Sequence, residues 1–156
     1  MYKILIFDRS GKIRPTLTTA LQDRANLVSI TSESAFQEEL KSKQFDLIFL
    51  DNDSMNGRAV KMLESMRSKD PFLPIIMTSE TEKAEMIVKA MNSGASDFLI
   101  HPISTSRVNI SFDKAIEIRD QRFEIAYHRR KQDVVYDFRD VVAFSPKMKA
   151  ILTSLE

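Results

Sequence analysis

The chain has 156 residues, of which 43% are hydrophobic and 29% are charged. This length fits one domain with a short remainder, and the composition is typical of a globular chain with a packed core. The 23 basic and 22 acidic residues leave a net charge of +1, so charge gives no indication of a nucleic acid or a membrane surface as a partner. With no cysteine and only two histidines, a disulfide framework, a thiolate nucleophile and a His/Cys zinc site are excluded.

Glycine content and the first residues exclude further classes. Only three glycines are present, so neither a dinucleotide-binding fingerprint nor a Walker A loop can be formed, and no bound nucleotide is expected. The first apolar run, Ile4–Phe7, ends at an acid, Asp8, and is too short for a signal peptide or a membrane span. We therefore expect a cytoplasmic protein with no membrane partner.

In chain order, short apolar runs alternate with stretches of helical spacing. The predicted strands are Ile4–Phe7, Leu27–Ile30, Leu47–Leu50, Ile75–Met77 and Phe98–Ile100. Several of these runs are apolar throughout, which indicates that both faces of the sheet are covered. The alternation predicts an α/β fold, a five-stranded parallel sheet of flavodoxin-like, doubly wound (βα)5 type, with ligands bound at the carboxyl ends of the strands.

A longer helical stretch, Ser104 to Gln132, follows the last predicted strand and contains no proline or glycine. Its apolar residues can be divided into two stripes. The first, for packing on the sheet, is Val108, Ala115, Ile118 and Ile125; the second, with near-heptad spacing for a homodimer, is Phe112, Ile116, Phe123 and Ala126. The alternative is one wide core face, since Arg119 and Arg130 interrupt the second stripe. The basic run 128–131 is expected to end the helix.

Polar residues end four of the predicted strands. Asp8 and Asp51 follow the first and third strands, which are neighbours in a doubly wound sheet, while Thr78-Ser79 and His101 end the fourth and fifth. A carboxylate in this place can attack phosphorus and form an acyl phosphate when a divalent cation offsets the charge. A single aspartate at a strand end is more often a helix cap, but four polar ends at one edge favour chemistry.

Residues 1–120 resemble the receiver domain of bacterial two-component response regulators. The resemblance rests on the spacing from Asp51 to Leu73-Pro74, to Ser79 and to the run Asp97-Phe98-Leu99-Ile100-His101-Pro102. It implies that Asp51 is the phosphoacceptor, Asp8 one of an acidic pair, Ser79 the switch hydroxyl and Phe98 the switch aromatic. It also implies a sensor histidine kinase as phosphoryl donor, output through the fourth helix, fifth strand and fifth helix, and no enzymatic activity beyond autophosphorylation and autodephosphorylation.

The chain departs from the family pattern at Arg9, at His101 and in the loop after the phosphoacceptor, where Asn52–Gly57 replaces the usual Met-Pro and glycine and should follow a different path. Arg9 replaces the second acid and can form a bidentate pair with Asp51, so magnesium binding is expected to be weak. His101 replaces a lysine and is a poorer partner for a phosphoryl group; the resemblance implies a cis bond between it and Pro102. The metal ligands would be Asp8, Asp51 and the backbone carbonyl of Asp53, whose side chain would replace part of the lost acid. We expect phosphorylation to be impaired.

The segment Tyr136–Met148 is similar to the opening of the AAA+ module of sigma-54-dependent transcription activators, with Ala143 in place of the usual glycine. The implied organisation is a receiver domain at 1–120, a helical linker at 121–135 continuous with the fifth helix, and the start of an AAA+ domain at 136–156. The Walker motifs and the DNA-binding part would lie beyond Glu156. The partners would then include the AAA+ domain of the same protein, and these 156 residues themselves would bind no nucleic acid.

Two alternatives to a phosphorylated receiver remain. One is a pseudo-receiver that works as a protein-interaction module without phosphorylation. The other is a haloacid-dehalogenase-like phosphohydrolase, since Asp51-Asn52-Asp53 reads as D-x-D after an apolar strand. Against the phosphohydrolase, the motif follows the third strand instead of the first, and no downstream pair of acids completes a metal site.

Overall fold

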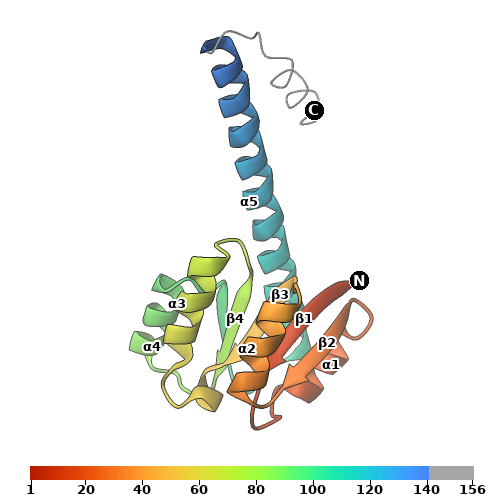
Figure 1. The fold of residues 1–156 in the computed structure, drawn as a ribbon. Coiled ribbons are helices and arrows are strands. Elements are labelled where there is room, and N and C mark those ends of the chain that lie inside the picture. Colours follow the sequence, from red (N-terminus) through yellow and green to blue (C-terminus); the bar gives the residue numbers. More distant parts are fainter. Residues whose placement is uncertain (141–156) are drawn as a thin grey trace. The chain divides into compact units, whose positions relative to one another are not determined.

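The structure, a computed structural model, describes residues 1–140, with side chains described as far as Arg129 (Figure 1). Its elements in chain order are β1 (Tyr2–Phe7), α1 (Arg14–Leu21), β2 (Ala25–Ile30), α2 (Glu33–Ser42), β3 (Leu47–Asp51), the 3-10 helix η1 (Asn52–Met55), α3 (Ala59–Lys69), β4 (Ile75–Ser79), α4 (Ala84–Asn92), β5 (Asp97–Ile100) and α5 (Thr105–Asp140). The sheet has five parallel strands in the order β2-β1-β3-β4-β5. The predicted fold class is confirmed.

Both faces of the sheet are covered because successive side chains of a strand point to opposite faces. In β1, Ile4 and Ile6 pack with residues of α1 and α5, while Leu5 and Phe7 pack with residues of α2, α3 and α4. All four are fully buried. Uninterrupted apolar strands are therefore what a two-sided core requires.

Arg67 joins the end of α3 to the loop between α4 and β5. Its guanidinium donates hydrogen bonds to the backbone oxygens of Gly94, at 2.6 Å, and Leu73, also at 2.6 Å. Gly94 has a φ of +113°, and a Cβ added there would lie 2.9 Å from Arg67 Nε. Glycine at 94 thus permits both the left-handed backbone and the close approach of the arginine.

The helix α5 differs from its prediction in length and in the assignment of its apolar residues. It continues past the basic run to Asp140, since no proline or glycine interrupts the chain there. Phe112 and Ile116, which we expected on a dimer face, are buried in the same core cluster as Val108. This corrects the two-stripe interpretation: side chains buried within one chain cannot contact a second. Arg119 forms an ion pair of 3.1 Å with Asp46, so its place beside the core is compatible with burial.

The chain divides into two compact units, Met1–Arg119 and Asp120–Glu156. In the second unit, Phe123 is 48% exposed and Ile125 is 54% exposed, and Ala126 is half-buried. Of the predicted AAA+ segment, 136–156, the part from 141 on lies outside the described residues. Within the described part of the chain, no helix is both long enough and apolar enough to cross a membrane.

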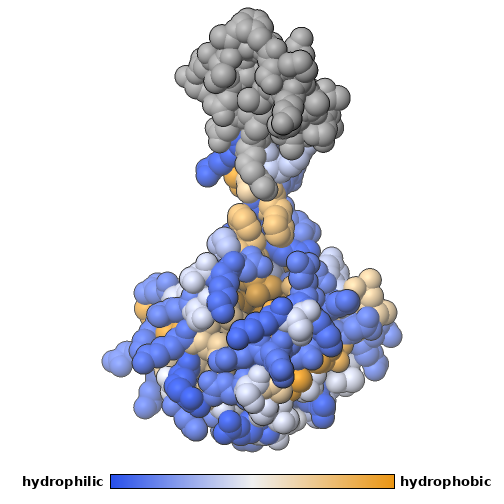
Figure 2. Space-filling model, viewed as in Figure 1, coloured by the Kyte–Doolittle hydropathy of each residue, from blue (hydrophilic) through white to orange (hydrophobic). Residues whose placement is uncertain are grey.

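The face of the first unit drawn in Figure 2 is mainly hydrophilic, with apolar side chains in small separate areas. A shallow groove of about 970 Å³ lies between α3 and α4. It contains Arg67, whose guanidinium already holds backbone oxygens. We place the functional site instead in a smaller cavity at the carboxyl edge of the sheet, where charged and hydroxyl groups converge.

Candidate functional site

The strand order brings the four predicted polar ends together. Phe7 of β1 pairs with Leu50 of β3, so Asp8 and Asp51, the next residues, lie side by side at the edge. Asp51 in turn pairs with Thr78 of β4. A cavity of about 270 Å³ opens at this edge. It is lined by Arg9, Ser10, Lys12, Asp51, Asp53, Ser54, Asn56, Glu80 and His101.

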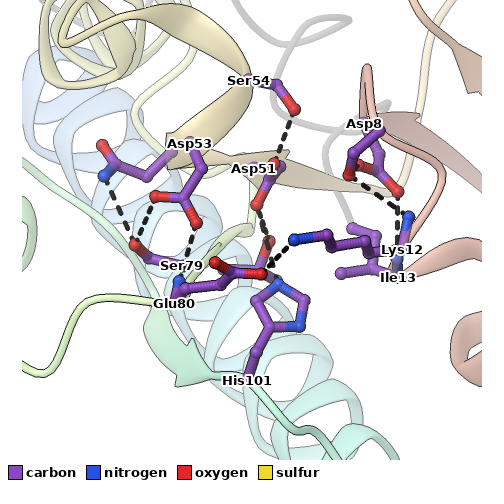
Figure 3. A network of polar contacts seen from close by, with 12 residues as sticks. Asp8, Lys12, Ile13, Asp51, Asp53, Ser54, Ser79, Glu80 and His101 are labelled. Carbon is purple, nitrogen blue, oxygen red and sulfur yellow. Dashed lines mark hydrogen bonds and ion pairs between the residues drawn. The ribbon is translucent and has the colours of Figure 1, made fainter.

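Asp51 is almost completely buried, with 3% of its surface exposed. The Ser54 hydroxyl donates a hydrogen bond of 2.6 Å to its Oδ2, and the Thr78 hydroxyl donates one of 2.9 Å to its Oδ1 (Figure 3). His101 Nε2 lies 3.8 Å from Oδ1. Burial raises the pKa of Asp51, and the nearby Asp8 and Asp53 charges raise it further, while the two hydroxyl hydrogen bonds lower it.

Asp8 has a structural role in the loop after β1. Its Oδ2 accepts a hydrogen bond of 3.0 Å from the backbone N–H of Ile13, the residue before α1. Its Oδ1 accepts one of 2.9 Å from the Ser10 hydroxyl. The carboxylate therefore caps the start of α1, which has no cap from the side chain of its own N-cap residue.

Arg9 does not form the expected pair with Asp51. Its side chain is exposed, and none of the ion pairs of the described residues joins it to that carboxylate. Its backbone N–H instead donates a hydrogen bond of 2.9 Å to the Ser54 hydroxyl. Ser54, which the sequence analysis did not select, thus links the loop after β1 to Asp51. The sequence held one indication of this role, since Ser54 lies only three residues after Asp51, in the segment that forms η1.

Asp53 also points elsewhere than predicted. Its two carboxylate oxygens accept hydrogen bonds from the Ser79 hydroxyl, at 2.8 Å, and from the backbone N–H of Glu80, at 2.7 Å. It therefore binds the end of β4 and does not take the place of the missing acid next to Asp8. The loop then turns through two left-handed residues, Asn56 with φ 50° and Gly57 with φ 83°.

The carboxylates at this edge of the sheet are held by hydrogen bonds within the chain. Asp8, Asp51 and Asp53 each have both carboxylate oxygens engaged by donors of the chain itself. Among the residues that the structure describes, no group of three or more His, Cys, Asp or Glu side chains is placed to hold a metal ion. Magnesium takes oxygen ligands, and with Arg9 in place of a second acid the ligands that the chain offers are the carboxylates of Asp8 and Asp51 and the backbone carbonyl of Asp53.

Lys12 and Glu80 form an ion pair that the sequence analysis missed. Glu80 raises the pKa of Lys12, first through the hydrogen bond and then through its charge, and Asp53 and Asp51 raise it further. The two residues meet only because β1 and β4 flank β3, and nothing in their local sequence indicates this contact.

The remaining predicted positions lie in the strand ends and the core. Ser79 is fully buried, and Phe98 is 8% exposed and packs in the core on the side of α2, α3 and α4. The bond between His101 and Pro102 is cis, as expected.

Comparison with known proteins assigns the family. The protein-family model of the response regulator receiver domain matches residues 4–112. This chain belongs to that family. A receiver domain is a regulatory domain and not a catalytic enzyme, so the phosphohydrolase alternative is wrong.

The chain is similar both to longer proteins that it covers in part and to proteins that it covers almost completely. The alginate biosynthesis transcriptional regulatory protein AlgB of Pseudomonas aeruginosa is 26% identical over 96% of this chain and 33% of its own length. The chemotaxis protein CheY of Listeria monocytogenes is 27% identical over 74% of this chain and 98% of its own. The structure of NtrX from Brucella abortus matches with a TM-score of 0.76 at 22% identity, over 85% of this chain and 30% of that one. This chain thus spans about a third of AlgB and NtrX.

Proposed function

We propose that this chain is the signal-receiving part of a sigma-54-dependent transcription activator and that Asp51 is phosphorylated poorly. The observation that supports this best is the engagement of both Asp51 oxygens by the Ser54 and Thr78 hydroxyls. Such hydrogen bonds draw electron density from the carboxylate and weaken it as a nucleophile. Among the described residues, no group of three acids is placed to hold a metal ion that would offset the incoming charge.

The assignment to a transcription activator rests on two supports. AlgB, a relative, is a transcriptional regulatory protein, and it aligns with 151 residues, beyond the receiver domain itself. The segment Tyr136–Met148 is similar to the opening of an AAA+ module. The chain then consists of a receiver domain at 1–120, a helical linker at 121–135 and the start of an AAA+ domain at 136–156. The protein would be cytoplasmic, and a sensor histidine kinase would be its phosphoryl donor. A dimer contact would involve residues after Arg119, such as Phe123 and Ala126.

Phosphotransfer from acetyl phosphate tests this function. The chain is incubated with acetyl phosphate with and without magnesium, and the intact mass is measured over time. We expect only a small labelled fraction, with little response to magnesium. The negative control is Asp51→Asn, and the positive control is a receiver with both acids and the lysine intact. Rapid, complete and magnesium-dependent labelling at Asp51 would contradict the proposal.

The engaged carboxylate also favours a second candidate, a pseudo-receiver that is never phosphorylated. The two candidates predict different behaviour of Asp51→Asn in the full-length activator. If transcription from the target promoter keeps its response to the signal, the pseudo-receiver is correct. If the response is lost, the Asp51 carboxylate is needed for signalling.

A further inference from the structure

The carboxylate of Asp53 binds the end of β4 through both of its oxygens. The Ser79 hydroxyl donates to one, at 2.8 Å, and the backbone N–H of Glu80 donates to the other, at 2.7 Å (Figure 3). A hydroxyl and a backbone N–H that converge on two oxygens of one anion are a typical donor set for a small oxyanion. Here the anion belongs to the chain itself.

The surroundings of Ser79 fix the direction of its hydroxyl. The side chain is fully buried, and its Oγ accepts hydrogen bonds from the backbone N–H of Thr81, at 3.1 Å, and from Asn52 Nδ2, at 3.5 Å. A serine hydroxyl has one hydrogen to donate, and Asp53 takes it. The hydroxyl is therefore not available to a group on Asp51 while this bond persists.

Positive charge also lies beside this carboxylate. The ammonium group of Lys12 pairs with Glu80, and the charge of Asp53 contributes to the raised pKa of that lysine. The Asp53 charge in turn contributes to the raised pKa of Asp51. Asp53 thus interacts electrostatically with both the lysine and the candidate phosphoacceptor.

We propose that Asp53 is a resident anion that holds the β4–α4 loop in the arrangement an external oxyanion would otherwise impose. A free phosphate ion, or a phosphoryl group on Asp51, has to displace this carboxylate before it can bind the Ser79 hydroxyl and the Glu80 N–H. The inference rests on the proposed function in one respect, that this loop responds to the signal.

The test uses the amide NMR signals of Glu80 and Thr81 in the whole chain, with inorganic phosphate as the probe. In the wild type we expect phosphate to leave both signals unchanged. In Asp53→Ala we expect the Glu80 signal to move upfield, because its N–H loses a charged acceptor. Phosphate should then bind to the variant at least about tenfold more tightly than to the wild type. The control Glu82→Ala removes one negative charge from the same loop at an exposed residue and should behave as the wild type does.

Two outcomes would overturn the proposal. One is a Glu80 signal in Asp53→Ala that is shifted no more than in Glu82→Ala. The other is equal phosphate binding by the wild type and by Asp53→Ala. If the alanine variant does not fold, Asp53→Asn keeps the side-chain volume and removes the charge, and the same two comparisons apply. Phosphorylation of Asp51 is not needed for this readout, so failure of the proposed function is seen separately, by mass.

Discussion

The Ser54 hydroxyl donates a hydrogen bond of 2.6 Å to the carboxylate of Asp51 and accepts one of 2.9 Å from the backbone N–H of Arg9. One side chain of η1 therefore connects the loop after β1 to the candidate phosphoacceptor. The Arg9 backbone is held at the site, while its guanidinium remains exposed. The consequences of this arrangement can be measured.

Magnesium affinity should depend on residue 9. Replacing Arg9 by aspartate removes a positive charge at the cavity and supplies an oxygen ligand beside Asp8, so we expect magnesium to bind about tenfold more tightly than to the wild type. Isothermal titration calorimetry measures this affinity. Arg14→Asp makes the same charge change at an exposed residue of α1 and serves as the control. Equal affinities in Arg9→Asp and the wild type would show that the arginine is not what weakens the site.

The Asp51 carboxylate should lower stability at neutral pH. Burial raises its native pKa above its ordinary value of 3.8, so the folded chain binds the proton more tightly than the unfolded chain does. The buried charge therefore lowers the free energy of unfolding at pH values above the native pKa. This loss shrinks as the pH falls through the native pKa, and it is absent below the ordinary value. An asparagine side chain in its place would still accept one hydroxyl hydrogen bond and donate another.

We therefore expect Asp51→Asn to raise the Tm at pH 7 by about 2–4 °C, the shift for about 1 kcal/mol in a chain of this size. The gain should shrink as the pH is lowered toward about 4. Thermal unfolding followed by circular dichroism measures both. Asp23→Asn, at an exposed position, should change little. A gain that is the same at both pH values would mean that charge is not its cause.

Phe112 should matter for stability and not for association. Its ring is fully buried and packs edge-on against Tyr2, with centroids 5.4 Å apart. Phe112→Ala is expected to lower the free energy of unfolding by about 3–5 kcal/mol, measured in urea. Phe123→Ala, at a residue that is 48% exposed, should cost about 1 kcal/mol or less. Similar losses in the two variants would contradict the placement of Phe112 in the core.

Association should depend on the residues after Arg119. Chains ending at residue 120 and at residue 140 are compared by light scattering at several concentrations. We expect the shorter chain to be monomeric, because Phe112 and Ile116 are buried within it. The longer chain should dimerise through the exposed apolar side chains of the second unit, among them Ile125. A dimer of the shorter chain would place the contact on the first unit instead.

The sheet and the positions of Asp8, Asp51 and Ser79 were predictable because they follow from the strand pattern alone. A run such as Leu47–Asp51 identifies a buried strand with an acid at its end, and parallel order places such ends at one edge. The direction of side chains in the loops was not predictable. The Asp53 carboxylate is held by Ser79 of β4, and Ser54 of η1 binds only the backbone N–H of Arg9, whose side chain stays exposed.

The assignment of Phe112 and Ile116 was wrong for a geometric reason. With 3.6 residues per helical turn, these residues fall with Val108 and Ala115 within an arc of about 100°, which is the width of a single core-facing stripe. Sequence spacing could not separate a core face from a dimer face there. Arg119, which we took as an interruption of the second stripe, is accommodated through its ion pair with Asp46.

Because a Cβ at position 94 would lie 2.9 Å from Arg67 Nε, these two positions constrain each other. A larger residue at 94 would displace the guanidinium, and the backbone oxygens of Leu73 and Gly94 would then lose their donor. Substitutions at 67 and 94 should therefore covary during divergence: related chains that replace the arginine are free to replace the glycine, as far as the left-handed backbone allows, and chains that keep the arginine are not.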